Sequence, residues 1–510
     1  MSMNNTQDVK IFKKPPYLMI AVLFVGAFVA FLNNTLLNVA LPSIMVAFDI
    51  EDYSTVQWLA TGYMLVSGIL VPASAYLITK FKTRSLFILS MSIFVIGTAL
   101  AAFAPSFELL LAGRMIQAAG AATMSPILMN VMLISFPVEK RGTAMGIFGL
   151  VMVLAPAIGP TLSGWIVEHY DWSVLFKMIL PIAIIALLLA IWKAEDILPN
   201  RPAKIDLFSV VLSTVGFGGL LYGFSTASSA GWGAVEVWGT ILVGTISIAW
   251  FVTRQFRLEE PLLDLRIFTY PAYAVASVVS MVLSVAMFSG MILTPAYVQN
   301  VRGIEPFEAG LMMLPGAIVM GIMSPITGKL FDKFGPRILA VTGLIIATIS
   351  TVGLGYLEVD STYTFIITMY TIRMLGISMV MMPIMTNGLN ALPNRLNPHG
   401  TAMNNTAQQV AGAIGTAVLV TIFNSHTNTR AAEIVADMKA NADPNAAQPT
   451  AEQLELIQGQ VMQQALLDGI TYSFFVAAGI TVVALILALF IKRVDITQRD
   501  DFMGAKPKEK

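Results

Sequence analysis

Arg114 and Arg373 each stand inside a long apolar stretch of the sequence, where ionisable side chains are rare. Placing an arginine at the centre of a membrane-spanning helix costs at least about 2.5–3.5 kcal/mol on insertion scales. Such a residue persists where it faces protein or water, so both arginines are candidates for contacting a bound substrate or for gating. Gln117 follows Arg114 by about one helical turn and would share its face. The alternative interpretation is that these side chains only tie neighbouring helices together.

Two groups of amide side chains also interrupt apolar stretches. Asn33, Asn34 and Asn38 fall in the first stretch, and Asn404 and Gln408 fall near the end of the chain. Asn34 and Asn38 are four residues apart and would share a helix face. Because polar groups are costly to leave in lipid, we expect these side chains to line an internal cavity and to bond a substrate. A purely structural role between helices is the alternative.

Several kinds of chemistry are disfavoured by the sequence. It has no cysteine, which excludes thiolate metal sites and cysteine nucleophiles, and its three histidines are scattered. No GxxxxGK[ST] pattern is present, so ATP is not the direct energy source. The 30 basic and 30 acidic residues balance, which gives no field for nucleic acid. We therefore expect neither cofactor, metal nor nucleic acid to bind, and no enzymatic activity.

The elements that must position these residues follow from composition. Of 510 residues, 56% are hydrophobic and 12% are charged, with a mean hydropathy of +0.76. Soluble proteins carry about a quarter charged residues, whereas a membrane span needs roughly 20 apolar residues. The composition therefore predicts an all-α polytopic membrane protein. The fourteen predicted spans are 17–46, 53–79, 85–105, 108–136, 141–167, 173–193, 206–227, 237–253, 271–300, 308–330, 337–357, 362–392, 399–424 and 470–491.

The distribution of Lys and Arg predicts how the spans are oriented. With an even number of spans, most of the 30 basic residues fall in the segments on one side, which the positive-inside rule assigns to the cytoplasm. Both termini are then cytoplasmic, in a multi-pass protein of the cell membrane. The long segment 425–469 lies outside, and its runs 427–440 and 451–468 are typical of two short amphipathic helices.

An internal repeat divides the chain. LITKFKTR at 77–84 aligns with LFDKFGPR at 330–337, GTAM at 142–145 recurs at 400–403, and Arg-Met occurs at both buried arginines. The order of the matches predicts six spans, a two-span insert and six further spans. Parallel six-helix repeats are the build of many secondary transporters, whose substrate site lies between the halves. The predicted divisions are an N-terminal six-helix bundle at 1–200, the insert at 201–260 and a C-terminal six-helix bundle at 261–510.

The motifs resemble those of the major facilitator superfamily, and within it the fourteen-span drug:proton antiporter branch (EmrB/QacA-like, lincomycin-resistance type). The resemblance covers essentially the whole chain. It implies two six-helix bundles in a monomer that exports amphipathic drugs or toxic compounds, with proton influx as the driving force. The segments that carry it are LNNTLLNVALP (32–42), RMIQAAGAA (114–122), APAIGPTLSG (155–164), PLLDLRIF (261–268) and GKLFDKFGPR (328–337).

The resemblance assigns gating roles to two motifs. Gly159, Pro160, Ser163 and Gly164 match the antiporter motif, in which proline bends a helix and glycine permits close packing. Their implied role is a contact between the halves that resists leak, although glycine and proline are also common in ordinary membrane helices.

The second motif holds Gly328, Asp332, Gly335 and Arg337. An acid in this loop can latch the inner gate through an acid–base pair and a helix terminus. The first repeat has Thr79 where the family has its acid, so we expect an asymmetric latch. A cluster of charges that only sets topology is the alternative.

One departure from the family pattern bears on coupling and cargo. Asn33 stands where the family has Asp, and none of the 30 acidic residues falls deep in a predicted span. Proton coupling then needs an acid at a helix end or an indirect route, or the protein uses another gradient. Without an internal carboxylate, neutral or anionic substrates fit better than cations. Export of an anionic metabolite, signalling nucleotide or lipid, with incidental drug resistance, is therefore a second hypothesis.

Overall fold

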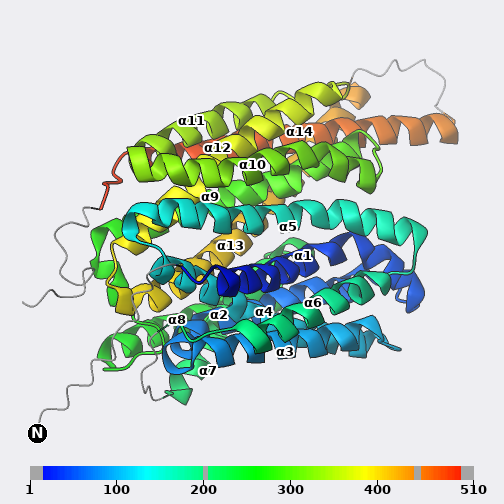
Figure 1. The fold of residues 1–510 in the computed structure, drawn as a ribbon. Helices are drawn as coiled ribbons and strands as arrows, with labels where there is room; N and C mark the ends of the chain where they lie inside the picture. The colour runs from blue at the N-terminus through cyan, green and yellow to red at the C-terminus, as the bar shows by residue number, and fades with distance from the viewer. Residues whose placement is uncertain (1–14, 199–204, 441–449, 495–510) are drawn as a thin grey trace, which may run out of the picture.

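The computed structural model describes residues 15–198, 205–440 and 450–494, and these ranges are helical throughout most of their length (Figure 1). Within them, fourteen helices are long and apolar enough to cross a membrane. The predicted all-α fold with fourteen spans is confirmed. The α-helices are α1 (Tyr17–Ala47), α2 (Tyr53–Lys80), α3 (Thr83–Ala102), α4 (Phe107–Ser135), α5 (Arg141–His169), α6 (Val174–Lys193), α7 (Leu207–Ala230), α8 (Val235–Arg257), α9 (Pro271–Ala296), α10 (Pro306–Phe334), α11 (Pro336–Leu354), α12 (Tyr363–Asn390), α13 (Asn397–Ala440) and α14 (Ala451–Ala488).

Short helical turns of other types connect some of these helices. Their bounds are η1 (Val138–Lys140), η2 (Leu265–Thr269), η3 (Tyr297–Val301) and η4 (Asn394–Leu396).

The first six and the last six helices meet along two long contacts. The more extensive one joins α5 to α10, which run side by side through the middle of the molecule (Figure 1). The other joins α2 to α13. Because α5 and α10 are distant in sequence, the α5–α10 contact positions residues that no local pattern would bring together. The predicted domain limits near residues 200 and 260 stay predictions, and residues 199–204 lie outside the described ranges.

The insert formed by α7 and α8 lies against the α2–α13 contact. Helix α7 packs on both α2 and α13. On the α2 side the rings of Trp58 and Tyr222 are 5.8 Å apart. On the α13 side Trp232, just after α7, donates from Nε1 to the hydroxyl of Thr421 at 2.7 Å. The insert therefore contacts helices of both six-helix sets at once.

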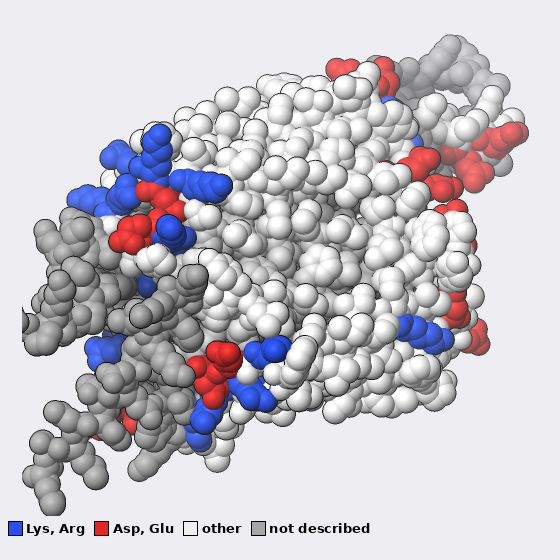
Figure 2. Space-filling model, viewed as in Figure 1, with Lys and Arg blue, Asp and Glu red and all other residues white. Residues whose placement is uncertain are grey.

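Charged side chains gather at the two ends of the helix bundle, and the band between them is almost free of charge (Figure 2). One end carries most of the visible Lys and Arg together with some acids, and we call it the basic end. The other carries mainly Asp and Glu, and we call it the acidic end. A charge-free band between polar ends is what a multi-pass membrane protein requires.

The segment 425–469 differs from its prediction. The runs 427–440 and 451–468 are not separate short helices, because α13 continues unbroken to Ala440 and α14 starts at Ala451. With 44 residues, α13 rises roughly 66 Å, about twice the thickness of a bilayer core. Arg430 joins the two extensions through its pair with Asp468, whose N···O distance is 2.9 Å. Residues 441–449 lie outside the described ranges.

Candidate functional site

Arg114 is fully buried where α4 meets α1 and α2. Its Nη1 donates to Oε1 of Gln117 at 3.0 Å and to the carbonyl oxygen of Asn33 at 3.4 Å. Its Nε donates to the carbonyl oxygen of Leu59 at 3.5 Å, and its guanidinium lies 4.4 Å from the ring centre of Tyr63. The predicted shared face of Arg114 and Gln117 is present, and Asn33 joins them.

The amide of Gln117 completes this network. Its Oε1 accepts a second hydrogen bond from Nδ2 of Asn33 at 3.2 Å, and its Nε2 donates to the hydroxyl of Thr98 on α3 at 2.9 Å. Close packing of α3 on α4 fixes these positions, since a Cβ on Gly97 would lie 2.5 Å from the backbone nitrogen of Gln117. One donor of the cluster is unpaired, because Nη2 of Arg114 has no hydrogen-bond partner among the described residues.

Arg373 occupies the related place in the last six helices and is also buried. Its Nε donates to the hydroxyl of Thr351 on α11 at 3.1 Å, and its Nη2 donates to the hydroxyl of Ser289 on α9 at 3.1 Å and to the carbonyl oxygen of Ala286. A Cβ on Gly290 would collide with Nη1 of Arg373. That nitrogen has no partner among the described residues, so both arginines keep one unpaired terminal nitrogen.

Of the remaining predicted amides, Asn34, Asn404 and Gln408 form no hydrogen bond with these clusters among the described residues. Asn34 is exposed, and the side chain of Asn38 lies outside what the structure describes. Asn404 is buried, and its Nδ2 has no partner within the described ranges. Gln408 is partly buried. The structure therefore brings Asn33, and not Asn34, to Arg114.

At the basic end, Asp332 of α10 caps the first turn of α5. Its Oδ1 accepts from the backbone N–H of Gly142 at 2.9 Å, and its Oδ2 accepts from the backbone N–H and the hydroxyl of Thr143 at 3.0 and 2.8 Å. The first N–H groups of a helix lack partners within it and attract negative charge. The carboxylate thus satisfies these donors across the α5–α10 contact.

The acid–base half of the predicted latch is absent from the described structure. The ion pairs found among the described residues do not involve Asp332. Arg337 is exposed, and Arg493 reaches only the backbone carbonyl oxygen of Asp332, at 2.9 Å. Donors at a helix start satisfy the carboxylate instead, so a basic partner is not needed.

Glycine allows α5 and α10 to approach closely enough for this cap. A Cβ on Gly142 would lie 2.6 Å from the carbonyl oxygen of Gly328, so the two backbones touch. Gly335 ends α10 with a φ of 80°, a conformation that favours glycine. The glycines of the loop motif therefore serve the geometry of the α5–α10 contact.

A second tie crosses the same end, and the sequence analysis did not single it out. Arg141, which starts α5, donates from Nη1 to Oδ1 of Asn390 at 3.2 Å and from Nη2 to Oδ1 of Asn394 at 3.4 Å. Asn130 of α4 donates to the hydroxyl of Thr401 on α13 at 2.8 Å. The position of Arg141 directly before the repeated GTAM segment was the available signal.

In the first repeat, the corresponding loop forms no equivalent hydrogen bond to the other helix set among the described residues. Thr79 stands where Asp332 stands in the second repeat, and its hydroxyl donates to the carbonyl oxygen of Ala75 within α2 at 2.8 Å. The cap is therefore present at α10 and absent at the equivalent end of α2.

Comparison with known proteins identifies the family. The family model described as Major Facilitator Superfamily matches residues 23–416. The chain belongs to the major facilitator superfamily.

Relatives and solved structures agree with this assignment. The lincomycin resistance protein LmrB of Bacillus subtilis is 41% identical over 481 residues, which cover 94% of this chain and 96% of LmrB. The uncharacterized MFS-type transporter YhcA of the same organism is 44% identical over 515 residues, covering 97% of this chain and 96% of YhcA. The human organic anion transporter MFSD10 has the same fold, with a TM-score of 0.64 at 13% identity over 93% of this chain and 100% of that one.

As a member of the major facilitator superfamily, the protein is a transporter and not an enzyme. Its resemblance to the drug-efflux branch agrees with relatives that are named as resistance proteins. In this superfamily member the glycines of the antiporter motif pack against two different helices, α1 and α10. A Cβ on Gly159 would lie 2.9 Å from Cβ of Thr35 on α1, whereas a Cβ on Gly164 would lie 3.3 Å from the ring of Phe307 on α10.

The other two members of the motif lie in the same helix. Pro160 is inside α5, and Ser163 is buried with its hydroxyl unpaired among the described residues. The gating role of the motif stays a prediction.

Proposed function

We propose that this transporter is a secondary active exporter that removes amphipathic drugs and other toxic compounds by alternating access. The names of its relatives, lincomycin resistance protein among them, support drugs as the cargo. We place the protein in the cell membrane as a monomer, with the basic end and both termini in the cytoplasm, because positive loops favour that side.

The observation that carries this proposal is the cap that Asp332 forms on α5. Asp332 belongs to the last six helices and Gly142 to the first six, and their atoms are 2.9 Å apart. This contact forms only when the two sets are together at the basic end. The described conformation is therefore closed at the basic end, which our proposal assigns to the cytoplasm, and breaking the cap and the Arg141 hydrogen bonds would open it.

The substrate site in this proposal lies between the two helix sets. Arg114 and Arg373 would each offer one unpaired, buried nitrogen to an acceptor on the compound. Asn404 would offer its unpaired Nδ2, and Asn33 and Gln117 would hold the Arg114 side chain in place. Gln408 is a further candidate for the cavity wall.

Coupling to proton influx requires a protonatable group. Within the described ranges most acids lie at helix ends or in loops, and Asp468, which lies inside α14, is paired with Arg430 of α13 at 2.9 Å. Asp332 is the described acid whose carboxylate joins the two sets through three hydrogen bonds. A protonated carboxyl would turn an O–H toward donors and lose part of this cap. In our proposal a proton that reaches Asp332 from the substrate site weakens the cap on α5. The two helix sets then separate at the basic end, and the proton is released into the cytoplasm.

The test is transport by inverted membrane vesicles that are energised to an acidic interior. Lincomycin is added while a fluorescent dye reports the internal pH. Drug-dependent loss of the gradient, abolished in Arg114→Ala, is the expected result. Drug uptake without any change in internal pH would overturn proton coupling and leave export standing.

A second candidate function is export of an anionic metabolite, signalling nucleotide or lipid. It is favoured by the two buried arginines with unpaired nitrogens, because a buried anion needs a compensating positive charge. Uptake of carboxyfluorescein, but not of lincomycin, into the same vesicles would favour this candidate over drug export.

A further inference from the structure

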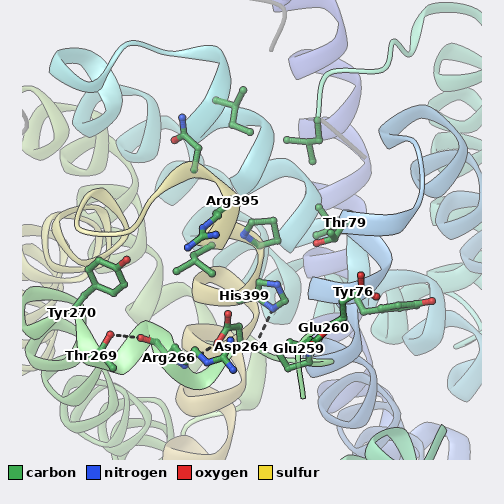
Figure 3. A pocket seen from close by; sticks show the side chains of 17 residues that line it. Tyr76, Thr79, Glu259, Glu260, Asp264, Arg266, Thr269, Tyr270, Arg395 and His399 are labelled. Atoms are coloured by element: carbon green, nitrogen blue, oxygen red, sulfur yellow. Dashed lines mark hydrogen bonds between the residues drawn. The ribbon is translucent and has the colours of Figure 1, made fainter. Parts of the chain in front are cut away.

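A cavity of about 580 Å³ lies at the basic end, away from the buried arginines (Figure 3). Its walls are the last turn of α2, the end of α4, the segment 259–270 that follows α8, and the start of α13. This volume lies within the range of small-molecule sites. Because α2 and α4 belong to the first six helices and α13 to the last six, both sets shape the cavity.

One side of the cavity carries acids. Glu259, Glu260 and Asp264 line it, and Glu259 has no ion pair or hydrogen bond with any other described residue. The neighbouring Arg266 does not neutralise this wall, because its Nη2 donates to the carbonyl oxygens of Phe256 and Leu258 at 3.4 and 3.3 Å. Glu259 is thus an unpaired negative charge beside the cavity.

The other side offers a cation and a donor. Figure 3 shows Arg395 and Glu259 on opposite sides of His399. Arg395 is exposed and has no partner among the described residues. His399 accepts the backbone N–H of Asp264 at Nδ1, at 3.1 Å. In the neutral ring the proton is therefore on Nε2, and this N–H has no partner within the described ranges.

Apolar side chains also line the cavity, among them Ile78, Ile134, Leu198 and Leu396. We propose that this cavity binds a small amphipathic zwitterion, with its ammonium group at Glu259 and its anionic group at Arg395 and Nε2 of His399. A zwitterion pairs both free charges at once, whereas a simple cation or anion leaves one of them unpaired. Charge-assisted hydrogen bonds of this kind are stronger than neutral ones.

Occupancy of this cavity would favour the closed gate. A ligand between α2, α4 and α13 binds only while these helices are together, so it shifts the population toward that state. Asn394 lines the cavity and also accepts the hydrogen bond from Arg141, which links the cavity to the gate. This regulatory consequence rests on the proposed function, whereas the binding itself does not.

Three matched probes test the binding in purified full-length protein in lipid nanodiscs. Nε-dansyl-lysine is the zwitterion, dansylcadaverine is the same molecule without its carboxylate, and 6-(dansylamino)hexanoate is the same molecule without its amine. Fluorescence titration against empty nanodiscs corrects for partition into lipid. We expect the zwitterion to bind about tenfold more tightly than either relative, since one charge-assisted bond contributes roughly that factor. Equal affinities of all three probes would overturn the proposal.

Substitutions test which of the two residues, Glu259 or Arg395, binds each charged group of the probe. Glu259→Gln should weaken binding of the zwitterion and of the amine about tenfold and leave binding of the anion unchanged. Arg395→Gln should weaken binding of the zwitterion and of the anion about tenfold and leave binding of the amine unchanged. Glu195→Gln and Lys329→Gln, two exposed residues that do not line the cavity, serve as controls and should change nothing. If all four variants bind the zwitterion alike, the probe sits elsewhere and the proposal fails.

Lincomycin transport by the vesicles described above separates the two proposals. Loss of probe binding in Glu259→Gln and Arg395→Gln, together with absent drug export by the unmodified protein, overturns the proposed function alone. Active drug export without preferential zwitterion binding overturns the cavity proposal alone.

Discussion

Oδ1 of Asp332 lies 2.9 Å from the backbone nitrogen of Gly142, although 190 residues separate them in the chain. The bond joins the end of α10 to the start of α5, where a Cβ on Gly142 would meet the carbonyl oxygen of Gly328 at 2.6 Å. The cap formed by the Asp332 side chain and the backbone contact between Gly142 and Gly328 thus lie at the same end of the α5–α10 pair. Replacing either feature should loosen the same end of the molecule.

Asp332→Asn should shift the population toward a conformation open at the basic end. The amide keeps one acceptor but loses the charge that the start of α5 favours, and hydrogen bonds to charged groups contribute about 1.5–3 kcal/mol. We therefore expect at least a tenfold change in the open-to-closed ratio. The chain has no cysteine, so spin labels at Glu139→Cys and Lys333→Cys report the distance by pulsed electron resonance. An unchanged distance distribution would contradict the capping role.

Gly328→Ala should oppose closure more strongly than Gly164→Ala. A Cβ on Gly328 would meet the backbone carbonyl carbon of Gly142 at 2.8 Å, whereas a Cβ on Gly164 would meet the Phe307 ring at 3.3 Å. Backbone cannot rotate away as a ring can, and overpacking typically costs about 1–3 kcal/mol. The same labelled pair should show longer distances only in Gly328→Ala. Equal effects of the two variants would argue against a tight contact at the basic end.

Gly290→Ala should displace Arg373 and reduce both stability and transport. The added methyl group would occupy the place of Nη1 of Arg373, so the side chain would have to leave its bonds to Ser289 and Thr351. We expect about 1–3 kcal/mol of destabilisation, visible as a lower Tm in detergent. Gly479→Ala is the matched control, because a Cβ there would meet nothing within 4 Å. A Tm equal to that of the control would count against the packing of Arg373 on α9.

Asn33→Asp should extend the cargo toward cations. The new carboxylate would lie beside the Arg114 and Gln117 cluster and supply the internal negative charge that the sequence lacks. A buried cation needs such a partner, so we expect ethidium efflux to rise at least about tenfold over the unmodified protein. Efflux by whole cells that express each form measures this directly, with Asn34→Asp as the control at an exposed position. Equal ethidium efflux in both variants would show that Asn33 does not control charge selectivity.

The Asp206–Arg254 pair should make stability depend on pH at the acid end of the scale. Hydrogen bonding from Arg254, at 2.7 Å, lowers the pKa of Asp206 from 3.8 to about 2. A lowered pKa in the folded state stabilises the protein above the ordinary pKa, and this contribution disappears as pH falls through the folded value. The Tm difference between the unmodified protein and Asp206→Asn should therefore be constant above about pH 5 and shrink between pH 3.8 and 2. A difference that persists unchanged at pH 2 would exclude this ion pair as its source.

The helices could be predicted from the sequence because apolar length is a local property. Gln117 could be placed beside Arg114 for the same reason, since a spacing of three residues fixes their relation on one helix. The runs 427–440 and 451–468 were correctly predicted to be helical, but their continuity with α13 and α14 was not predicted, because polar composition indicates a segment outside the membrane and does not show whether a helix continues into it. In the structure the two extensions are paired with each other, as at Arg430 and Asp468.

Partners across the two helix sets could not be predicted in this way. Arg141 bonds Asn390 over 249 residues, and nothing in the local pattern of either segment specifies the other. Asp332 was singled out through its motif, yet two of its three hydrogen bonds come from backbone N–H groups, which every residue except proline carries. The identity of such a partner follows from the approach of two helices and not from residue type.

Helix α7 has a consequence for compounds dissolved in the bilayer. It packs against α2 and α13 together, from the ring contact of Tyr222 with Trp58 to the cluster of Leu212 with Tyr76 and Ala402. Acyl chains therefore meet protein, not the junction itself, along that flank. The insert helices α7 and α8 make no comparable contact with the described α5 and α10, which have α12 as a common neighbour. A lipophilic molecule that approaches sideways through a leaflet consequently encounters two unequal flanks, of which the one formed by α2 and α13 carries the insert.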